Sequence, residues 1–339
     1  MPLNTHCSPA ELLGALLAAI HKIVILSCFI IGAAVKLPIK AVLWYVWPAK
    51  PASFSSILIT GASSGIGAEL ARQLAAPGVR LVLLARRAAR LDATRRDCEA
   101  LGAEVEVVTI DVKDAEAMQK AIAAADEARP LDCVIANAGV HPSMLSDAVG
   151  PAQAAHPGAG RGAVFASATL APLTDVNVGG LINTIAPVIP RMQGRRRGQI
   201  ALVASIASLC PLTDPEWISY HASKVWVRAL GMGLRGMLEP DGVGVTVLCP
   251  GLVASEMASA TLGSLDLPTW LPIRPLSTET AARRIIHAIG TNVGVHVMRE
   301  HAAEFLGGQF LGHNVLPPFA FNAMMAGWRF DQSSTGKGD

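Results

Sequence analysis

The sequence predicts an α/β fold built on a doubly wound parallel sheet, on three observations. Short apolar runs alternate with segments of helical composition along most of the chain, the runs are apolar along their length, and a glycine-rich turn follows the first of them. Continuous apolar strands that alternate with helices are typical of a parallel sheet covered on both faces. The 339 residues, 51% hydrophobic and 16% charged, suffice for one such domain with appendages.

The predicted strands and helices follow one another in a regular alternation. The expected strands are Ser56–Thr60, Leu81–Ala85, Val105–Ile110, Cys133–Ala136, Ile200–Ala204, Val245–Cys249 and Val293–Met298. The expected helices include Ala68–Ala76, Ala88–Leu101, Ala115–Ala128 and Trp217–Leu238. Ligands of such sheets bind beyond the carboxyl ends of the strands. Four residues stand at such ends, and one site is expected to collect them: Gly61, Asn137, Ser205 and Pro250.

A glycine-rich turn, Gly61 to Gly67, lies between the first predicted strand and the first predicted helix. Glycines in this position let the backbone approach a pyrophosphate, and the N-terminus of the following helix favours its negative charge. A glycine-rich run alone could equally be an ordinary loop. The strand before it and the helix after it favour a dinucleotide-binding turn.

Tyr220 and Lys224 stand four residues apart in the predicted helix Trp217–Leu238. Residues at this spacing share one face of a helix, so the lysine charge can stabilise a nearby phenolate. Such a pair makes tyrosine a usable acid at neutral pH. Tyr and Lys also occur at this spacing by chance on solvated helices, and only the accompanying motifs favour a catalytic interpretation.

Taken together, these motifs resemble the short-chain dehydrogenase/reductase family, in its short single-domain branch with Thr-Gly-x-x-x-Gly-x-Gly and Tyr-x-x-x-Lys. The resemblance runs from about Ser56 to about Met298 and implies a Rossmann fold. It implies four catalytic residues, Asn177, Ser205, Tyr220 and Lys224. The cofactor-binding residues that it implies are Thr60, Gly61, Ser63, Ser64, Gly65, Ile66, Gly67, Arg86, Arg87, Asp111, Val112, Asn137, Ala138, Gly139, Tyr220, Lys224, Pro250 and Gly251.

The resemblance also implies a role for each catalytic residue. Tyr220 would protonate a carbonyl oxygen as hydride arrives, and Lys224 would lower the pKa of Tyr220 and hold the nicotinamide ribose. Ser205 would bind the reacting oxygen, and Asn177 would position a water that relays protons. The alternatives are that Ser205 caps the end of its strand and that Asn177 bonds to nearby backbone.

One departure from the family pattern lies between Gly139 and Asn177, which are 38 positions apart. The family typically needs fewer. Most of the surplus is Ala, Gly and Pro around Val149 to Gly162, a composition typical of an irregular loop. The insertion leaves the helix boundaries near Asn177 undefined by the sequence.

The end of the second predicted strand, Ala85-Arg86-Arg87, indicates the cofactor. An acidic residue there would hold the ribose 2′-hydroxyl of NAD, whereas a cation accommodates the 2′-phosphate of NADP. No carboxylate stands at this position, and a guanidinium grips phosphate with two parallel hydrogen bonds. The sequence therefore favours NADP(H). The alternative is that both arginines are solvated residues at a helix start.

The N-terminal segment differs from the rest of the chain. We expect residues 1–52 to form a hydrophobic helical membrane anchor and residues 53–300 to form the NADP-binding catalytic domain. Residues 301–339 are expected to form an apolar extension with a polar tail. Residues 12–47 are overwhelmingly apolar, but the longest uncharged run, residues 23–35, gives only about 20 Å of helix. A bilayer core measures about 30 Å. Either a tilted span or a helix in one leaflet fits; a soluble packing arm is the alternative.

Charge and composition limit the remaining function classes. Lys36, Lys40 and Lys50 place the catalytic domain on the cytosolic side, with the endoplasmic reticulum as one candidate membrane. The net charge of +2 indicates no nucleic-acid partner, and the arginines at 195–197 read as a solvated loop. Six cysteines without C-x-x-C spacing and nine scattered histidines predict neither a disulfide framework nor a metal site.

The predicted function is an NADP-dependent oxidoreductase that interconverts a carbonyl and a secondary alcohol on a hydrophobic substrate. Two apolar segments, Leu252–Pro275 and Phe305–Phe330, fit a lipid-like ketone such as a 3-keto-acyl or ketosphingoid compound, or a steroid or retinoid. Ordinary core packing explains both segments equally well. The alternative function is a non-catalytic NADP-binding scaffold or sensor. A homodimer is expected only from the habit of the family.

Overall fold

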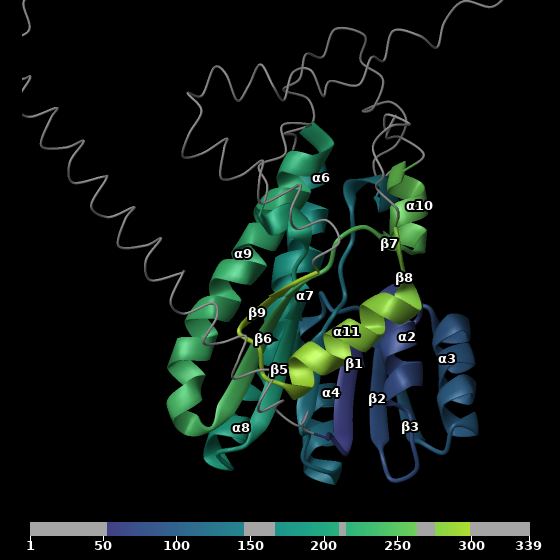
Figure 1. Cartoon of the computed structure of the whole chain (residues 1–339), viewed down its shortest axis with the longest axis vertical. Coiled ribbons are helices and arrows are strands. Elements are labelled where there is room, and N and C mark those ends of the chain that lie inside the picture. The colour runs from purple at the N-terminus through teal and green to yellow at the C-terminus, as the bar shows by residue number, and fades with distance from the viewer. Residues whose placement is uncertain (1–52, 146–166, 210–214, 263–274, 299–339) are drawn as a thin grey trace, which may run out of the picture. The chain divides into compact units, whose positions relative to one another are not determined.

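A seven-stranded sheet carries the fold in a computed structural model that describes residues 53–145, 167–209, 215–262 and 275–298. All its strand pairs are parallel, in the order β3-β2-β1-β4-β5-β6-β9 (Figure 1). The strands are β1 (Ser56–Thr60), β2 (Arg80–Ala85), β3 (Glu104–Thr109), β4 (Cys133–Ala136), β5 (Gly198–Val203), β6 (Val243–Cys249) and β9 (Val295–Val297). From β1 the chain adds β2 and β3 on one side and then β4, β5, β6 and β9 on the other side. Parallel sheets bind ligands at the position where the strand order changes in this way, here between β1 and β4.

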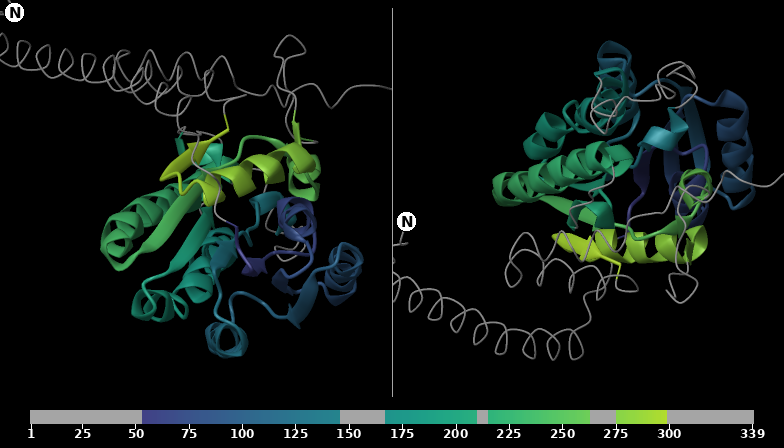
Figure 2. Two further views of the ribbon diagram at one scale, coloured as in Figure 1. Left: turned by 60° about the horizontal axis from the view of Figure 1, so that its bottom comes forward. Right: turned by 90° about the horizontal axis from the view of Figure 1, so that it is seen from above.

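Helices cover both faces of the sheet (Figures 1 and 2). One face carries α2 (Gly65–Leu74), α3 (Ala88–Ala100) and α11 (Thr278–Gly290). The other face carries α4 (Ala115–Ala128), α7 (Gly180–Ile185), α8 (Ile189–Gly194) and α9 (Pro215–Leu238). Two further helices, α6 (Ser167–Thr174) and α10 (Glu256–Leu262), lie at one end of the sheet in Figure 1, and α10 is flanked by the short paired strands β7 (Val253–Ala254) and β8 (Leu276–Ser277).

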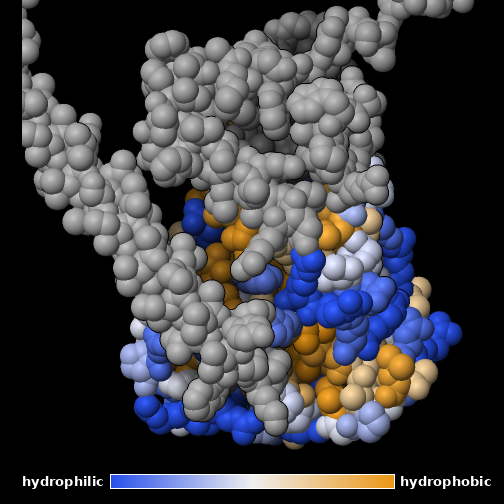
Figure 3. Space-filling model, viewed as in Figure 1, coloured by the Kyte–Doolittle hydropathy of each residue, from blue (hydrophilic) through white to orange (hydrophobic). Residues whose placement is uncertain are grey.

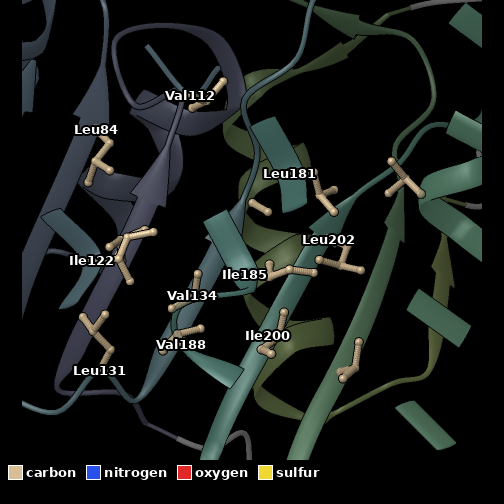
Figure 4. Packing of buried hydrophobic residues seen from close by; sticks show 14 of the residues in the cluster. Leu84, Val112, Ile122, Leu131, Val134, Leu181, Ile185, Val188, Ile200 and Leu202 are labelled. Atoms are coloured by element: carbon tan, nitrogen blue, oxygen red, sulfur yellow. The ribbon is translucent and has the colours of Figure 1, made fainter. Parts of the chain in front are cut away.

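Each face of the sheet has its own hydrophobic core. Figure 4 shows the core under α4 and α7, where Ile122 and Ile185 meet the strand residues Val134 and Ile200. The core on the opposite face joins the strands to α2, α3 and α11, and hydrophilic residues cover the outer sides of α3 and α11 (Figure 3). Burial on both faces explains why the inner strands are apolar at every position.

Strand β3 is an exception to the expected coverage. It lies at the edge of the sheet and pairs only with β2, and none of its residues is fully buried. Glu104 and Glu106 point outward and form ion pairs with Arg129 and the buried Arg80, respectively. Charged side chains on an edge strand discourage pairing with other chains. The prediction that every strand is covered on both faces is therefore wrong for β3.

The predicted Rossmann-type architecture is confirmed, with element bounds that differ by a few residues. The strand Ser56–Thr60, the strand Cys133–Ala136 and the helix Ala115–Ala128 have the predicted bounds. Helix α2 begins at Gly65, three residues before its predicted start, because the last glycines of the turn already form its first turn. Helix α11, for which we predicted no element, begins where the Ser277 hydroxyl accepts a hydrogen bond from Thr280 N at 3.1 Å.

Arg195 is not simply solvated, in contrast to the prediction, whereas Arg196 and Arg197 are 67% and 74% exposed. Arg195 donates to the buried carboxylate of Asp126 at 2.9 Å and to the Leu131 carbonyl at 2.7 Å. Arg197 lies 3.3 Å from Asp132. This turn therefore joins α8 to the segment that leads into β4, at the end of the sheet opposite the glycine turn.

Several predicted segments lie outside the described residues: the N-terminal anchor 1–52, the loop 149–162, and the apolar tail 305–330. Within the described ranges, none of the helices is long and apolar enough to cross a membrane. Only residues 252–262 and 275 of the apolar segment after Pro250 are described.

Two glycines of α9 test how closely this helix packs on the sheet. A Cβ at Gly231 would lie 2.3 Å from Val247 Cγ2 and 2.9 Å from Leu202 Cδ1, whereas one at Gly233 would meet nothing within 4 Å. We expect Gly231→Ala to lower the free energy of unfolding in urea by about 1–3 kcal/mol, because α9 must move off the sheet. Gly233→Ala should raise it by roughly 0.5–1 kcal/mol, because glycine is a poor helix former. Equal effects would contradict close packing at Gly231.

Candidate active site

The glycine turn after β1 has a backbone that only glycines accommodate. Gly61 and Gly65 have φ values of +69° and +54°. A Cβ at Gly67 would lie 2.3 Å from the Gly61 carbonyl oxygen. The turn ends at the N-terminus of α2, which has no acidic residue in its first turn and no side-chain cap from Ser64. Amide groups at a helix start attract anions, so the turn fits the pyrophosphate of a dinucleotide.

Asn137 and Thr60 hold the turn in place from the ends of β4 and β1. The Asn137 amide donates to the Thr60 carbonyl at 3.0 Å and to the Gly61 carbonyl at 3.4 Å. The Thr60 hydroxyl accepts from the backbone of Asn137 at 3.1 Å and of Ala138 at 3.2 Å. Both residues were predicted to bind the cofactor. Their side chains brace the turn that would do so.

The remaining predicted cofactor residues differ in their surroundings. Ala138 Cα lies 2.9 Å from where a Cβ of Gly61 would stand, and the Pro250 carbonyl accepts from Ile206 N at 2.8 Å. Val112 is buried, and its side chain packs directly on the backbone of Gly180 in α7. Its side chain is thus part of the core under α7. Ile66 and Gly251 are half-buried beside the turn and after β6.

Tyr220 and Lys224 lie one turn apart on α9, and both are buried, at 8% and 4% exposure. Lys224 Nζ donates to the Val203 carbonyl at the end of β5, at 3.0 Å, and lies 5.6 Å from the centroid of the Tyr220 ring. The Tyr220 hydroxyl is hydrogen-bonded to the Ser205 side chain. The end of β5 thus fixes the lysine and contacts the tyrosine.

Ser205 fits both of its sequence interpretations. Its hydroxyl accepts from Ala207 N at 3.1 Å, which is the local capping bond expected of a serine after a strand. The same side chain reaches Tyr220. A hydroxyl with one bond to backbone and one to the phenol is held in a fixed position next to the group that would exchange a proton.

Asn177 lies in a π-helical stretch, Asp175–Gly179, between α6 and α7. Its side-chain oxygen accepts from Val140 N at 2.8 Å, and its amide donates to the Val140 carbonyl at 3.0 Å and to Ser223 Oγ at 3.1 Å. The side chain is 1% exposed. It therefore clamps the segment after β4 against α9. That Asn177 also positions a water stays a prediction.

Two of the predicted catalytic residues, Asn177 and Lys224, meet at Gly139. A Cβ at Gly139 would lie 3.2 Å from Asn177 Oδ1 and 3.2 Å from Lys224 Nζ. Asn177 in turn bonds to Ser223, whose hydroxyl donates to the Tyr220 carbonyl at 2.7 Å. The structure thus brings together residues from β5, α9 and the π-helical stretch.

Burial opposes charge on both members of the pair. It lowers the pKa of Lys224 to about 8. It also raises the pKa of Tyr220, whereas the hydrogen bond with Ser205 acts in the opposite direction. At neutral pH the lysine therefore carries its charge and the phenol its proton. The Lys224 ammonium lies 5.6 Å from the centroid of the Tyr220 ring, and a positive charge beside a phenol favours the phenolate over the neutral form.

His141 and His221 both lie closer to the site than the sequence indicated. The His141 ring is 2% exposed and packs edge-on against the Tyr220 ring, with centroids 5.1 Å apart. Burial lowers the pKa of His141 to about 4, so the ring is neutral at pH 7. His221, which we expected on the helix surface, is half-buried and its Nδ1 contacts the Ala207 carbonyl. The one sequence feature that could have indicated this contact is that His141 directly follows the Asn137–Val140 segment.

The two predicted NADP-binding arginines occupy different places. Arg86 is 60% exposed, with Nη1 3.8 Å from Asp111 Oδ2. Arg87 reaches back over the glycine turn, with Nε and Nη2 each 3.3 Å from Ser63 Oγ and Nη2 also bonded to Ser64. Arg87 also forms an ion pair with Glu256, a residue that the sequence analysis did not single out. A solvated position thus describes Arg86 but not Arg87.

Comparisons with known proteins identify the family of the chain. The model of the short chain dehydrogenase family matches residues 55–263. The chain belongs to this family. It is 37% identical over 208 residues to an uncharacterized oxidoreductase of Myxococcus xanthus, covering 61% of this chain and 75% of that protein. It is 30% identical over 239 residues to a 3-dehydrosphinganine reductase of Arabidopsis thaliana, covering 69% of this chain and 62% of the relative.

A solved structure shares the fold. The short-chain dehydrogenase of Sphingobium yanoikuyae in complex with NADPH superimposes with a TM-score of 0.60 at 24% identity, covering 84% of this chain and 99% of that chain. The match of the family model confirms the predicted family. This short-chain dehydrogenase is an oxidoreductase that acts on CH–OH and C=O groups of small molecules with a nicotinamide cofactor. Within the described ranges, no group of three or more His, Cys, Asp or Glu could hold a metal ion.

The buried charge of Lys224 has a measurable cost in stability. The pKa of Lys224 falls from 10.5 to about 8 on folding. Below about pH 8 the protonated Lys224 therefore destabilises the native state by roughly 3 kcal/mol. This destabilisation disappears as the pH rises from about 8 towards 10.5. We expect wild-type stability to rise with pH between these values, and Lys224→Met to lack that rise. Urea unfolding at about pH 7 and pH 9.5 measures it. The exposed Lys120→Met is the control, and a Lys224→Met difference that is independent of pH would contradict the buried charge.

Proposed function

We propose that this short-chain dehydrogenase is an NADP(H)-dependent reductase of hydrophobic ketones, with Tyr220 as its general acid. The buried contact of Tyr220 with Ser205 and Lys224 carries the proposal. A phenol that keeps its proton at neutral pH and stands beside an ammonium is suited to give that proton to an oxygen that becomes negative. The alternative, a scaffold that binds NADP without turnover, gives no reason to keep an ammonium buried beside a phenol.

The nicotinamide supplies the hydride, and the residues of this chain handle the oxygen and the proton. Ser205 donates a hydrogen bond to the carbonyl oxygen, and Tyr220 transfers its phenolic proton to the same oxygen. The Lys224 ammonium, 5.6 Å from the ring, stabilises the phenolate that remains. The reverse reaction takes the alcohol proton onto the phenolate. Asn177 is proposed to hold the water through which the phenolate regains a proton.

The choice of NADP over NAD rests on the residues after β2. Ala85 offers no carboxylate for a ribose hydroxyl, and two cations follow it. Arg87 shares the Ser63 hydroxyl at 3.3 Å, so one guanidinium and two hydroxyls face the edge of the glycine turn. A phosphate on the ribose would find donors there. Arg86, beside Asp111, is free to add a second charge because it is mostly exposed.

The hydrophobic substrate class rests on sequence outside the site. The segments after Pro250 and in the tail are apolar, and the Arabidopsis relative is named a 3-dehydrosphinganine reductase. We therefore propose a lipid-like ketone, with a ketosphingoid or 3-keto-acyl compound ahead of a steroid or retinoid. The apolar segment of residues 12–47 is proposed to attach the enzyme to a membrane, with the catalytic domain on the cytosolic side.

Tyr220→Phe tests the catalytic part of the proposal. The variant removes only the phenolic oxygen, so it should lose turnover of long-chain ketones with NADPH, by at least about 100-fold, and keep its affinity for NADPH. Nicotinamide absorbance measures turnover and fluorescence titration measures binding. The chain has one other tyrosine, so Tyr45→Phe is a matched control. A fully active Tyr220→Phe enzyme would refute the mechanism, and an inactive wild type that binds NADPH would favour the scaffold.

Replacing the arginines tests the cofactor assignment. Arg86→Ala and Arg87→Ala should each weaken NADPH binding, roughly 10- to 100-fold for Arg87, because a charge-assisted bond to phosphate is lost. NADH binding should change little. Arg95→Ala on the same helix, where Arg95 pairs with Asp92 and Glu99, is the control. Equal losses for NADPH and NADH would overturn the assignment.

A further inference from the structure

Glu256 joins two parts of the molecule that are far apart in the sequence. It is the first residue of α10, shortly after the Pro250-Gly251 segment. Its carboxylate lies 2.9 Å from Arg87 Nη1 and also pairs with Arg90 Nη1, both at the start of α3. One carboxylate therefore bridges two guanidinium groups and ties α10 to α3.

The same arginine is shared with the glycine turn. Arg87 donates to Ser63 and Ser64 with Nε and Nη2 and to Glu256 with Nη1. The residue before Glu256 is also close to the turn, since Ser255 Cβ lies 3.4 Å from where a Cβ of Gly65 would stand. An anion that enters at the edge of this turn must therefore compete with Glu256 for Arg87.

The ion pairs of Glu256 are weak enough to be displaced. The side chains of Arg87, Arg90 and Glu256 are 43%, 51% and 48% exposed, respectively. Ion pairs at such exposure contribute little because water and salt screen them. A ribose phosphate carries about two negative charges and three acceptor oxygens, against one charge on a carboxylate. Phosphate is therefore the stronger partner for two adjacent guanidinium groups.

We propose that Glu256 occupies the place of the nucleotide phosphate on Arg87 and Arg90, so that binding of a 2′-phosphorylated nucleotide releases α10 from α3. This inference rests on the proposed function, because it requires NADP(H) as the cofactor. Glu256 then tunes discrimination between phosphorylated and unphosphorylated nicotinamide dinucleotides and couples cofactor binding to α10, which lies within the apolar segment after Pro250. If Glu256 instead orients the arginines for phosphate, Glu256→Gln should bind 2′-phosphorylated nucleotides more weakly than the wild type.

Nucleotide binding to Glu256→Gln tests the competition without turnover. The probes are 2′,5′-ADP, which carries the phosphate but no nicotinamide, and 5′-AMP, which lacks it. Loss of the competing charge should tighten binding of 2′,5′-ADP and NADPH roughly twofold to fivefold, the range set by an exposed ion pair, and leave 5′-AMP and NADH unchanged. Glu279→Gln removes a comparable exposed carboxylate, paired with Arg283 at 2.7 Å, and is the matched control.

Hydrogen exchange in α10 gives a second readout. In the wild type, 2′,5′-ADP should speed amide exchange in residues 256–262, whereas in Glu256→Gln exchange there should be fast without ligand. If the wild type binds 2′,5′-ADP and Glu256→Gln binds it equally or more weakly, the competition by Glu256 is wrong. The assignment of NADP(H) as the cofactor would still stand in that case. Failure of both proteins to bind 2′,5′-ADP would overturn the proposal together with the assignment of NADP.

Discussion

A lysine ammonium held out of water beside a tyrosine ring is the interaction on which the site depends. Burial makes the charge of Lys224 costly and lowers its pKa to about 8, and a charge in such low-polarity surroundings acts more strongly on its neighbours than it would in water. The Val203 carbonyl at 3.0 Å keeps the ammonium in place. The hydrophobic cores on the two faces of the sheet offset the free energy of burying this charge, because they hold α9 against β5 and β6.

The strand ends supply the precision that this pair requires. Polar side chains at the carboxyl ends of β1, β4 and β5 bond to one another or to backbone, so few of them can reorient. Asn137 braces the glycine turn, Asn177 clamps the segment after β4, and Ser205 connects β5 to Tyr220. Gly139 leaves the space in which Asn177 and Lys224 approach one another. Cofactor turn and proton donor are thus parts of one bonded network.

Local patterns predicted the elements that local chemistry determines. The apolar run Ser56–Thr60, the glycine turn and the Tyr220–Lys224 spacing each act within a few residues, and the structure has the strand, the turn and the shared helix face there. The sequence did not indicate that Arg87 rather than Arg86 covers the glycine turn, or that Glu256, 169 positions further along the chain, pairs with Arg87. It also did not indicate that His141 packs on Tyr220. Those contacts depend on tertiary packing, which no short spacing encodes. The membrane anchor stays a prediction.

The most direct test of this account is the ionisation of Tyr220 itself. In a Tyr45→Phe background Tyr220 is the only tyrosine, so ultraviolet absorbance of the phenolate reports its pKa alone. The titration is run with NADP⁺ bound, with Lys224 intact and as Lys224→Met. The account predicts that the phenolate forms at a lower pH when Lys224 is present than in Lys224→Met, because a positive charge beside the phenol favours its ionised form. Identical titration curves would contradict the claim that the lysine makes this tyrosine acidic.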